Sequence, residues 1–333
     1  MRTSKRAPYI SAALMAVVYL LSSGLAVSDE KSSGGFDCRQ LDRLETPASP
    51  IGWLERSLWA SRCYLFQARG VRISGDGVRT LALSRAIRDG VEREAASYLD
   101  GPAVVYEGHG RIARDSLSGL AVGGVSPSAS LPIIDNHYRV SLGGESRIAG
   151  RPSVRLDIEP LDSLRYGHRL WLDRSTGLPL KRVLIDADGQ IIETFQMTEL
   201  DQPTLYEGAV AFDASTEVPP QPWQLGWLPT GYRSLALPQA SSIDSLPLGH
   251  RLYSDGLASF SVFIEPLATP DRALTPGLHR LGVSYAAVRH LRVAGRIYQV
   301  VVMGEVPPEV LRRVAAQVEY RPAVASQPRS ATP

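Results

Sequence analysis

The chain has 333 residues, of which 44% are hydrophobic and 21% charged, and its 36 basic and 34 acidic residues give a formal net charge of +2. Three of the basic residues, Arg2, Lys5 and Arg6, lie in the N-terminal segment, so the remaining chain is close to neutral. A chain without a basic excess is not expected to bind nucleic acid, and a length of about 300 residues is typical of two domains.

The N-terminal segment has the pattern of a secretory signal peptide. The three basic residues precede an apolar run over 10–21, and Gly24-Leu25-Ala26 follows it. The run is shorter than the ~20 apolar residues that span a bilayer. The sequence therefore predicts a leader over residues 1–26, cleaved near Ala26, and a soluble, exported protein.

A helix flanked by two cysteines begins the mature chain. Ser49 is suited to cap a helix that has Pro50 at its first position, and apolar residues follow at helical spacing over 51–58. Cys38 and Cys63 lie on either side of this helix. Because thiols oxidise in exported proteins, we predict a disulfide between them, with two free thiols as the alternative.

Strand-like segments punctuated by glycine turns follow from Tyr64 to Ile158. Their order predicts one antiparallel sheet with a helix packed against it, and not alternating βα units. The fold class is therefore mainly β, of the α+β type. Residues 117–132 are rich in Gly, Ser and Pro, and we predict a mobile loop there that borders a groove.

The stretch from Arg169 to Leu200 predicts three antiparallel strands joined by turns at 175–177 and at Asp188-Gly189. Pairing about the second turn sets three pairs on one face and two on the other: Leu180 with Met197, Arg182 with Phe195, Leu184 with Glu193, and Val183 with Thr194, Ile185 with Ile192. Neither face is purely apolar. Such a sheet is expected to be curved and partly covered on both sides.

Prolines at positions 219, 220 and 222 predict a stiff linker over 218–224, between a large region at 27–217 and a small one at 225–320. In the small region, Asp255-Gly256 predicts a hairpin turn, and strands are predicted over 278–289 and 296–303. Apolar residues at helical spacing after Pro307 predict a helix packed on this sheet. Residues 321–333 are predicted to form a disordered tail.

No arrangement of residues points to catalysis, a metal or a cofactor. The six histidines are scattered, and no serine lies in a GxSxG turn. We therefore predict a protein that is not an enzyme. Any single large aromatic side chain of the first region is expected to fill the core, because buried aromatic residues usually serve packing. As a group they are still candidates for a groove that takes acyl chains or a peptide: Trp53, Trp59, Tyr64, Phe66, Tyr98, Tyr106, Trp171 and Phe195.

Four segments of the chain, in collinear order, are WLDRSTGLPLKRVLIDADGQIIETFQMTEL at 171–200, GWLPTGY at 226–232, RLYSDGLASFSVFIEP at 251–266 and VVMGEVPPEVLRRVA at 301–315. Together they resemble the MucB/RseB family of regulators of the envelope-stress sigma factor sigma-E. The resemblance implies a first domain like the lipoprotein carriers LolA and LolB, which is an unclosed β-barrel with a helical plug. It also implies a smaller second domain of sheet and helix.

The resemblance further implies a periplasmic protein that binds the periplasmic segment of a membrane-spanning anti-sigma factor and shields it from a regulatory protease. A lipid or lipopolysaccharide signal would release it. The partner-binding candidates are Trp223, Trp227, Tyr253, Phe260 and Phe263. A lipid or lipoprotein carrier and an exported enzyme with an unrecognised site are the alternatives, and homo-oligomer formation stays open.

Overall fold

The computed structural model describes residues 35–88, 91–101, 105–109, 126–211, 222–235, 249–267 and 273–321. The predicted leader and most of the predicted linker and tail lie outside these ranges. No helix in the described ranges is long and apolar enough to cross a membrane.

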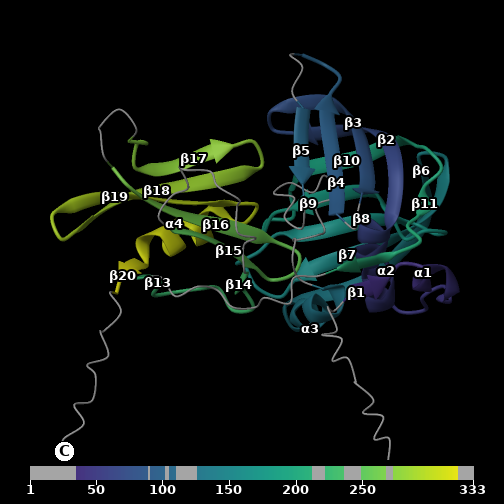
Figure 1. The fold of residues 1–333 in the computed structure, drawn as a ribbon, viewed down its shortest axis with the longest axis horizontal. Helices are drawn as coiled ribbons and strands as arrows, with labels where there is room; N and C mark the ends of the chain where they lie inside the picture. Colours follow the sequence, from purple (N-terminus) through teal and green to yellow (C-terminus); the bar gives the residue numbers. More distant parts are fainter. Residues whose placement is uncertain are drawn as a thin grey trace, which may run out of the picture. The chain divides into compact units, whose positions relative to one another are not determined.

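A ten-stranded antiparallel sheet dominates the first part of the chain (Figure 1). The strands follow the order β5-β4-β3-β2-β10-β9-β8-β7-β6, with β11 beside β2. Their bounds are β2 (Tyr64–Ser74), β3 (Gly77–Arg88), β4 (Val91–Tyr98), β5 (Val105–His109), β6 (Tyr138–Ile148), β7 (Arg151–Pro160), β8 (Gly167–Asp173), β9 (Pro179–Ile185), β10 (Ile191–Leu200) and β11 (Thr204–Leu205).

The sheet is strongly curved. Strand β10 contacts β6 although three strands lie between them. Within the described residues, the edge strands β5 and β6 do not pair with each other, so the sheet is an unclosed barrel. The prediction of a mainly β fold built on one large antiparallel sheet is confirmed.

Two helices cover one face of this sheet. Helix α2 (Pro50–Cys63) begins as predicted, because Ser49 accepts a hydrogen bond from the Gly52 amide at 3.1 Å and Pro50 occupies the first position. Helix α3 (Pro127–His137) packs against α2 and β6. A short helix, α1 (Gln40–Arg43), precedes them, and β1 (Gly35–Asp37) pairs with β12 (Ala209–Ala211).

The predicted loop at 117–132 was wrong from Pro127 onward, where α3 begins, and residues 117–125 lie outside the described ranges. Ser126 caps α3 by accepting from the Ala129 amide at 3.2 Å. Pro127 stands at the first helical position, where its missing N–H costs nothing. This Ser-Pro start repeats that of α2, so composition concealed a recognisable helix signal.

The register of the β9–β10 hairpin is largely as predicted. Arg182 faces Phe195, Leu184 faces Glu193, and Val183 faces Thr194. The predicted pair of Ile185 with Ile192 was wrong, because Ile185 pairs with Ile191 and a bulge follows before Glu193. The connection runs over residues 186–190, where the Asp186 carboxylate accepts the amides of Asp188 and Gln190.

A six-stranded antiparallel sheet with one helix forms the second part of the chain, and this predicted architecture is confirmed. Its order is β14-β15-β16-β19-β18-β17, and α4 packs on β18 and β19. The bounds are β14 (Arg233–Leu235), β15 (Gly249–Ser254), β16 (Ser259–Pro266), β17 (Gly277–Leu281), β18 (Ser284–Val293), β19 (Arg296–Gly304) and α4 (Pro308–Ala316), with a separate pair of β13 (Trp223–Leu225) and β20 (Val318–Tyr320).

The segment 278–289 is a hairpin and not the single strand predicted. Gly282 adopts a φ of +68° and reverses the chain between β17 and β18. The turn predicted at Asp255-Gly256 does join β15 to β16, with Tyr253 opposite Phe260. The domain limits predicted at 217 and 225 stay a prediction.

Candidate ligand-binding site and contact between the sheets

One face of the large sheet, called here the inner face, carries most of its buried apolar side chains. Cross-strand pairs place five residues of neighbouring strands in one row across this face: Leu156, Leu170, Arg182, Phe195 and Arg72. Trp53 and Leu54 of α2 and Ile134 of α3 pack over the half of the face formed by β6, β7 and β8. The helices therefore plug the concave side of the sheet.

A small pocket opens on the inner face at the C-terminal end of α2. Its wall is mainly apolar, with a few polar groups, and consists of Ser61, Phe66, Leu83, Ser84, Arg85, Glu94, Leu178, Pro179 and Met197. The Ser61 hydroxyl is buried and has no hydrogen-bond partner among the described residues. Arg85 and Glu94 form an ion pair of 3.5 Å at one side. An apolar wall with a few fixed polar groups is typical of ligand pockets, but this pocket would have to widen before it could take an acyl chain.

Three of the predicted lipid-groove residues lie together near this pocket. Phe66 lines it, and Phe66, Tyr98 and the buried Phe195 pack in one apolar cluster on the inner face. The prediction for these three stays open, since their placement is compatible with a ligand as well as with the core.

The other predicted groove residues are dispersed. Trp53 is buried between α2 and the sheet. Trp59 and Tyr64 are buried in a separate cluster around the disulfide. Trp171 alternates with the buried Leu170 and Leu172, so it points to the opposite face, where Lys181 lies 4.7 Å from its ring. The side chain of Tyr106 lies outside the described part of the structure.

Four charged residues meet at the middle of the inner face. The Arg182 guanidinium donates to Glu193 at 2.9 Å and to Glu305, which follows β19, at 3.3 Å, and Arg72 pairs with the other oxygen of Glu193. Arg182 and Glu193 are almost fully buried. Burial alone would lower the pKa of Arg182, but Glu305 and Glu193 outweigh it and raise this pKa. The cluster therefore joins the two sheets through charge.

His168 lies beside this cluster on the inner face, opposite Leu184 and Ile158. Its side chain is buried, and neither ring nitrogen has a hydrogen-bond partner in the described residues. Burial, helped by the positive charge of Arg182, lowers the pKa of His168 from 6.5 to about 3. The imidazole is therefore neutral in the folded protein at every pH above that value.

Acidification is expected to destabilise the first sheet through His168. The unfolded chain takes up the proton below pH 6.5 while the folded protein resists it, so stability is complete above pH 6.5 and falls toward pH 3. Between pH 7 and pH 5 this amounts to about 2 kcal/mol, at ~1.4 kcal/mol for each unit below 6.5. Urea unfolding at both pH values measures it. His168→Phe should remove this part of the pH dependence, and an unchanged dependence would refute the assignment.

Three partner-binding candidates of the second part are core residues. Trp223, Tyr253 and Phe260 are all buried in the cluster between the second sheet and α4. Their side chains offer little surface to a partner because they fill this core. Alternation along the strands explains the result, since Tyr253, Phe260 and the buried Val262 and Val302 share the face that α4 covers.

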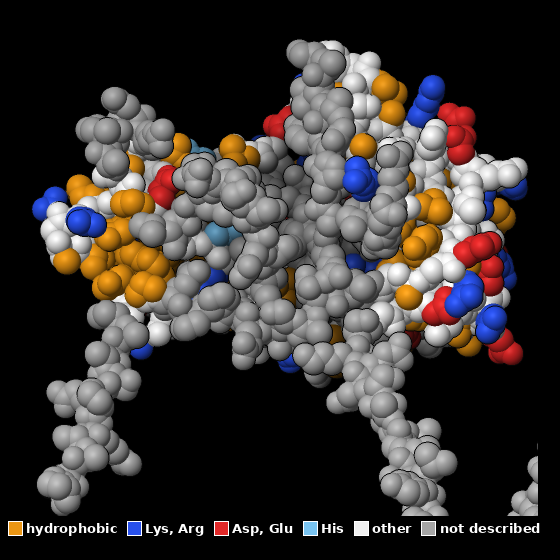
Figure 2. All heavy atoms as spheres, viewed as in Figure 1, with side chains coloured by type: hydrophobic (Ala, Val, Ile, Leu, Met, Phe, Trp, Pro, Cys, Tyr) orange, Lys and Arg blue, Asp and Glu red, His pale blue; other side chains and the backbone are white. Residues whose placement is uncertain are grey.

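The remaining two candidates are half-buried. Trp227 packs at the edge of the same core with the Arg313 guanidinium 3.9 Å from its ring, and Phe263 stacks on His250 on the opposite face of the sheet. An exposed apolar surface adjoins Trp223, where Tyr298 and Tyr320 each approach its ring to 4.9 Å. Figure 2 shows hydrophobic side chains gathered where β19 and β20 lie. Tyr320, in β20, is 40% exposed.

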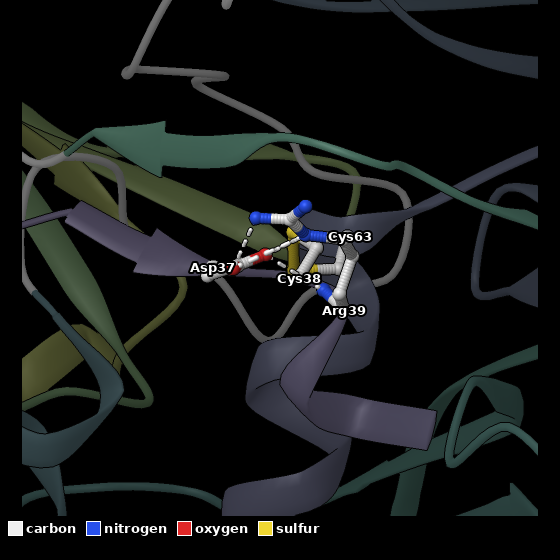
Figure 3. Close-up of a disulfide and its surroundings, with 4 residues drawn as sticks. All are labelled: Asp37, Cys38, Arg39 and Cys63. Carbon is white, nitrogen blue, oxygen red and sulfur yellow. Dashed lines mark hydrogen bonds and ion pairs between the residues drawn. A yellow bond between two sulfur atoms is a disulfide. The ribbon is translucent and has the colours of Figure 1, made fainter. Parts of the chain in front are cut away.

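The structure pairs Cys38 with Cys63 in a disulfide, which links the start of α1 to the end of α2 (Figure 3). Both cysteines are fully buried, and Phe36 stacks on Trp59 beside them. Asp37 and Arg39 form an ion pair of 2.7 Å on the solvent side. The bond therefore holds β1 and α1 against the first sheet.

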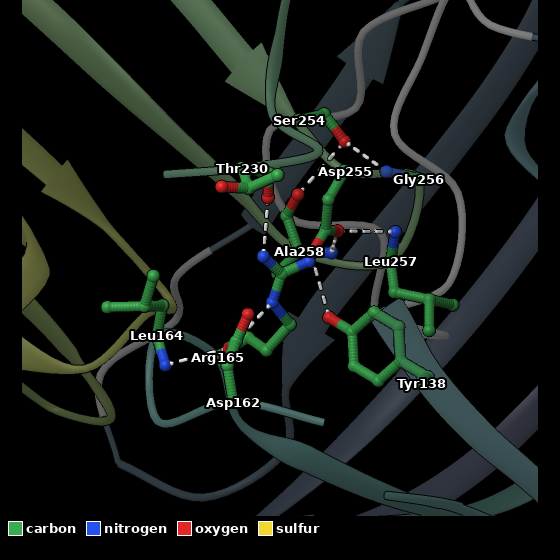
Figure 4. A network of polar contacts seen from close by, with 10 residues as sticks. All are labelled: Tyr138, Asp162, Leu164, Arg165, Thr230, Ser254, Asp255, Gly256, Leu257 and Ala258. Atoms are coloured by element: carbon green, nitrogen blue, oxygen red, sulfur yellow. Dashed lines mark hydrogen bonds and ion pairs between the residues drawn. The ribbon is translucent and has the colours of Figure 1, made fainter. Parts of the chain in front are cut away.

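A buried polar network connects the β15–β16 turn with the first sheet (Figure 4). One Asp255 oxygen accepts the amides of Leu257 and Ala258 and so shapes the turn. The other oxygen accepts from the Tyr138 hydroxyl at 2.8 Å and from the Arg165 guanidinium at 3.1 Å. The Arg165 and Asp255 side chains are 0% exposed. Burial, and then the charge of Asp255, raises the pKa of Tyr138 well above its ordinary value, so its hydroxyl stays a donor.

Arg165 makes further polar and aromatic contacts besides its pair with Asp255. Its remaining donors reach the Asp162 carboxylate at 3.1 Å and the Thr230 carbonyl at 2.6 Å, and its guanidinium carbon lies 5.5 Å from the ring centroid of Tyr138 and 5.4 Å from that of Tyr232. Sequence inspection missed Arg165, Tyr138 and this use of Asp255. Only the turn signal at Asp255-Gly256 pointed to the place.

An open, curved sheet with a helix-covered inner face, joined to a second sheet by buried polar contacts, defines a two-domain binding protein. Family models for the MucB/RseB N-terminal domain and the MucB/RseB C-terminal domain match residues 120–221 and 217–319. The chain belongs to the MucB/RseB family, whose members are regulatory binding proteins and not enzymes.

Relatives and solved structures support this assignment over most of the chain. The sigma factor AlgU regulatory protein MucB of Pseudomonas aeruginosa is 34% identical over 303 residues, which cover 84% of this chain and 93% of MucB. The sigma-E factor regulatory protein RseB of Escherichia coli K12 is 26% identical, over 83% of this chain and 92% of RseB. The MucB chain in the P. aeruginosa MucA/MucB complex has a TM-score of 0.60 at 30% identity and covers 83% of this chain, with all of that chain matched.

Proposed function

We propose that this protein is a periplasmic regulator that binds the periplasmic segment of a membrane-spanning anti-sigma factor and shields it from regulated proteolysis. The supporting observation is the likeness, through both domains, to a MucB chain that was solved in complex with MucA. A further structure of MucB holds the periplasmic part of MucA. Export through the predicted leader at 1–26 is part of the proposal.

Binding and protection are tested together. The mature protein, without residues 1–26, is mixed with the purified periplasmic segment of the anti-sigma factor encoded in the same genome. We expect a stable complex by calorimetry, and cleavage of the segment by an added protease slowed at least tenfold. A complex without protection would refute shielding, and no complex would refute the regulator.

We propose that an amphiphile with an acyl chain releases the partner by entering the pocket beside Ser61. The pocket wall supports this role, because Phe66, Leu83 and Met197 give it an apolar lining and the Arg85–Glu94 ion pair gives it one polar side. Lipid binding without any partner binding would instead favour a carrier.

Filling the pocket should block the lipid and spare the partner. Ser61→Leu places an apolar side chain in the wall and removes a buried hydroxyl that lacks a described partner. We expect lipid affinity to fall at least tenfold, which is ~1.4 kcal/mol, with unchanged binding of the anti-sigma segment. Displacement of a fluorescent fatty acid measures the first, and calorimetry the second.

The matched control is Ser57→Ala, one helical turn earlier on α2. Ser57 is also buried without a described partner but does not line the pocket. Equal losses of lipid affinity in both variants would place the lipid elsewhere.

A further inference from the structure

The turn Ser254–Ala258 reaches from the second sheet into the helix-covered side of the first. Leu257 is buried in the same apolar cluster as Trp53, Leu54 and Ile134. Gly256, at a φ of +100°, lies so close to α3 that a Cβ there would meet Ser130 at 2.9 Å. The turn is thus seated against both helices that cover the inner face.

The turn is also built to keep its shape when it leaves this seat. Ser254 Oγ donates to the Ala258 carbonyl and accepts from the Gly256 amide, each at 2.9 Å, and one Asp255 oxygen holds two more amides. The other Asp255 oxygen, Gly256 and the Leu257 side chain contact the first sheet and its helices. Separation breaks these contacts but none of the hydrogen bonds that shape the hairpin, so the hairpin stays intact.

The charges at the contact make it easier to open. Arg165 and Asp255 are fully buried, and a buried ion pair gains little net stability because both charges have lost their hydration. On separation each would regain water. An apolar contact of the same size would lack this compensation.

Helix α2 connects the turn to the pocket. Trp53 and Leu54, near its start, pack with Leu257, and Ser61, seven residues after Leu54, lines the pocket wall. At 1.5 Å per residue these sites are about 10 Å apart along one rigid helix. A ligand that displaces α2 from the sheet would also disturb the seat of Leu257.

We propose that the Ser254–Ala258 turn is a latch that holds the two domains in one arrangement, and that a ligand which displaces α2 opens it. The opening step rests on the proposed lipid binding, whereas the latch itself does not. Because the two events are linked, a latch held closed must weaken lipid binding by the same factor by which lipid opens the latch.

The latch is tested by the distance between spin labels at Ala187 and Ala316, one exposed position in each domain. The labelled cysteines are introduced under non-reducing conditions that keep the native disulfide. We expect one narrow distance distribution. Arg165→Met and Asp255→Asn each strand a buried charge and should shift the ratio of closed to open protein by a factor of about 100 to 1,000.

The double variant separates a latch from a simple loss of stability. Arg165→Met with Asp255→Asn leaves no fully buried charge unpaired, because Asp162, the other partner of Arg165, is 32% exposed, and should restore most of the narrow distribution. The control is Arg151→Gln, which breaks the pair of Arg151 with Asp173 inside the first domain, where Asp173 likewise shapes a turn. It should leave the distribution unchanged. Three results would each overturn the latch. The single variants could show the wild-type distance distribution, or the double variant could be as open as the single ones. The third result is a loss of amide protection in β8 and β9 of the single variants, which would mean that the first domain itself is destabilised.

The coupling is tested with 16-carbon lysophosphatidylglycerol added to the labelled wild type. Displacement of a fluorescent fatty acid reports binding on the same sample. Bound lipid that populates the open distance supports the coupling, and bound lipid with an unchanged distance overturns it. If no lipid binds, the proposed lipid signal fails, and the label distances of the charge variants alone decide whether the latch exists.

Discussion

Replacing Arg182 by Met should lower the free energy of unfolding by about 3 kcal/mol, at the lower end of the cost of breaking a buried ion pair. Arg182 is 6% exposed and Glu193 is 3% exposed, so neither charge can turn to water when its partner is lost. Arg72 still pairs with Glu193, which keeps the cost from being larger. Urea unfolding at pH 7 measures the change.

Two further variants test this explanation. Adding Glu193→Gln to Arg182→Met should recover part of the loss, because the stranded carboxylate is removed. Arg139→Met breaks an ion pair whose side chains are 70% and 64% exposed, and should change stability by less than about 0.5 kcal/mol. If Arg182→Met and Arg139→Met lower the free energy of unfolding equally, burial does not explain the stabilising effect of the Arg182 cluster.

The sequence predicted the local strand pairing around Arg182 but not the contact of Arg182 with the second sheet. The turn after Ile185 and the pairing of Arg182 with Phe195 and of Leu184 with Glu193 follow from residues close together in the chain. The mixed polarity of that face follows as well. Glu305, however, is 123 positions from Arg182, and nothing in either segment signals that they meet.

The same limit applies to the aromatic candidates. Size and hydrophobicity select Trp53, Phe260 and Trp171 equally, but the first two lie in cores and the third on the outer face of the sheet. A side chain's face depends on strand register, and a strand whose two faces are both partly buried shows no alternation to fix it. The turn at Asp255 was recognised from its local sequence. The role of Asp255 in the domain contact was not, because its partner Arg165 lies 90 positions away in the chain.

The disulfide should be worth about 3.5 kcal/mol, because Cys38 and Cys63 are 25 positions apart and closing a loop of that size restricts the unfolded chain. Cys38→Ala with Cys63→Ala should lower the free energy of unfolding by that amount in urea without reductant. Wild-type protein reduced by dithiothreitol should match the variant, and the variant should not respond to dithiothreitol.

The loss should begin at the N-terminus of the domain. Without the bond, β1 is held by its pairing with β12, by the hydrogen bond of the Cys38 amide to the Gly208 carbonyl, and by the stacking of Phe36 on Trp59. Hydrogen exchange should therefore show the largest loss of protection at the amides of β1 and β12, while β7 and β8 lose only what the lower global free energy of unfolding removes. An equal loss in all four strands would mean that this edge does not open separately. Cys63 ends α2, the helix that carries Ser61 and packs against Leu257. If only β1 opens, the domain contact should stay intact. If the end of α2 also frays, the distribution of distances between labels at Ala187 and Ala316 should broaden.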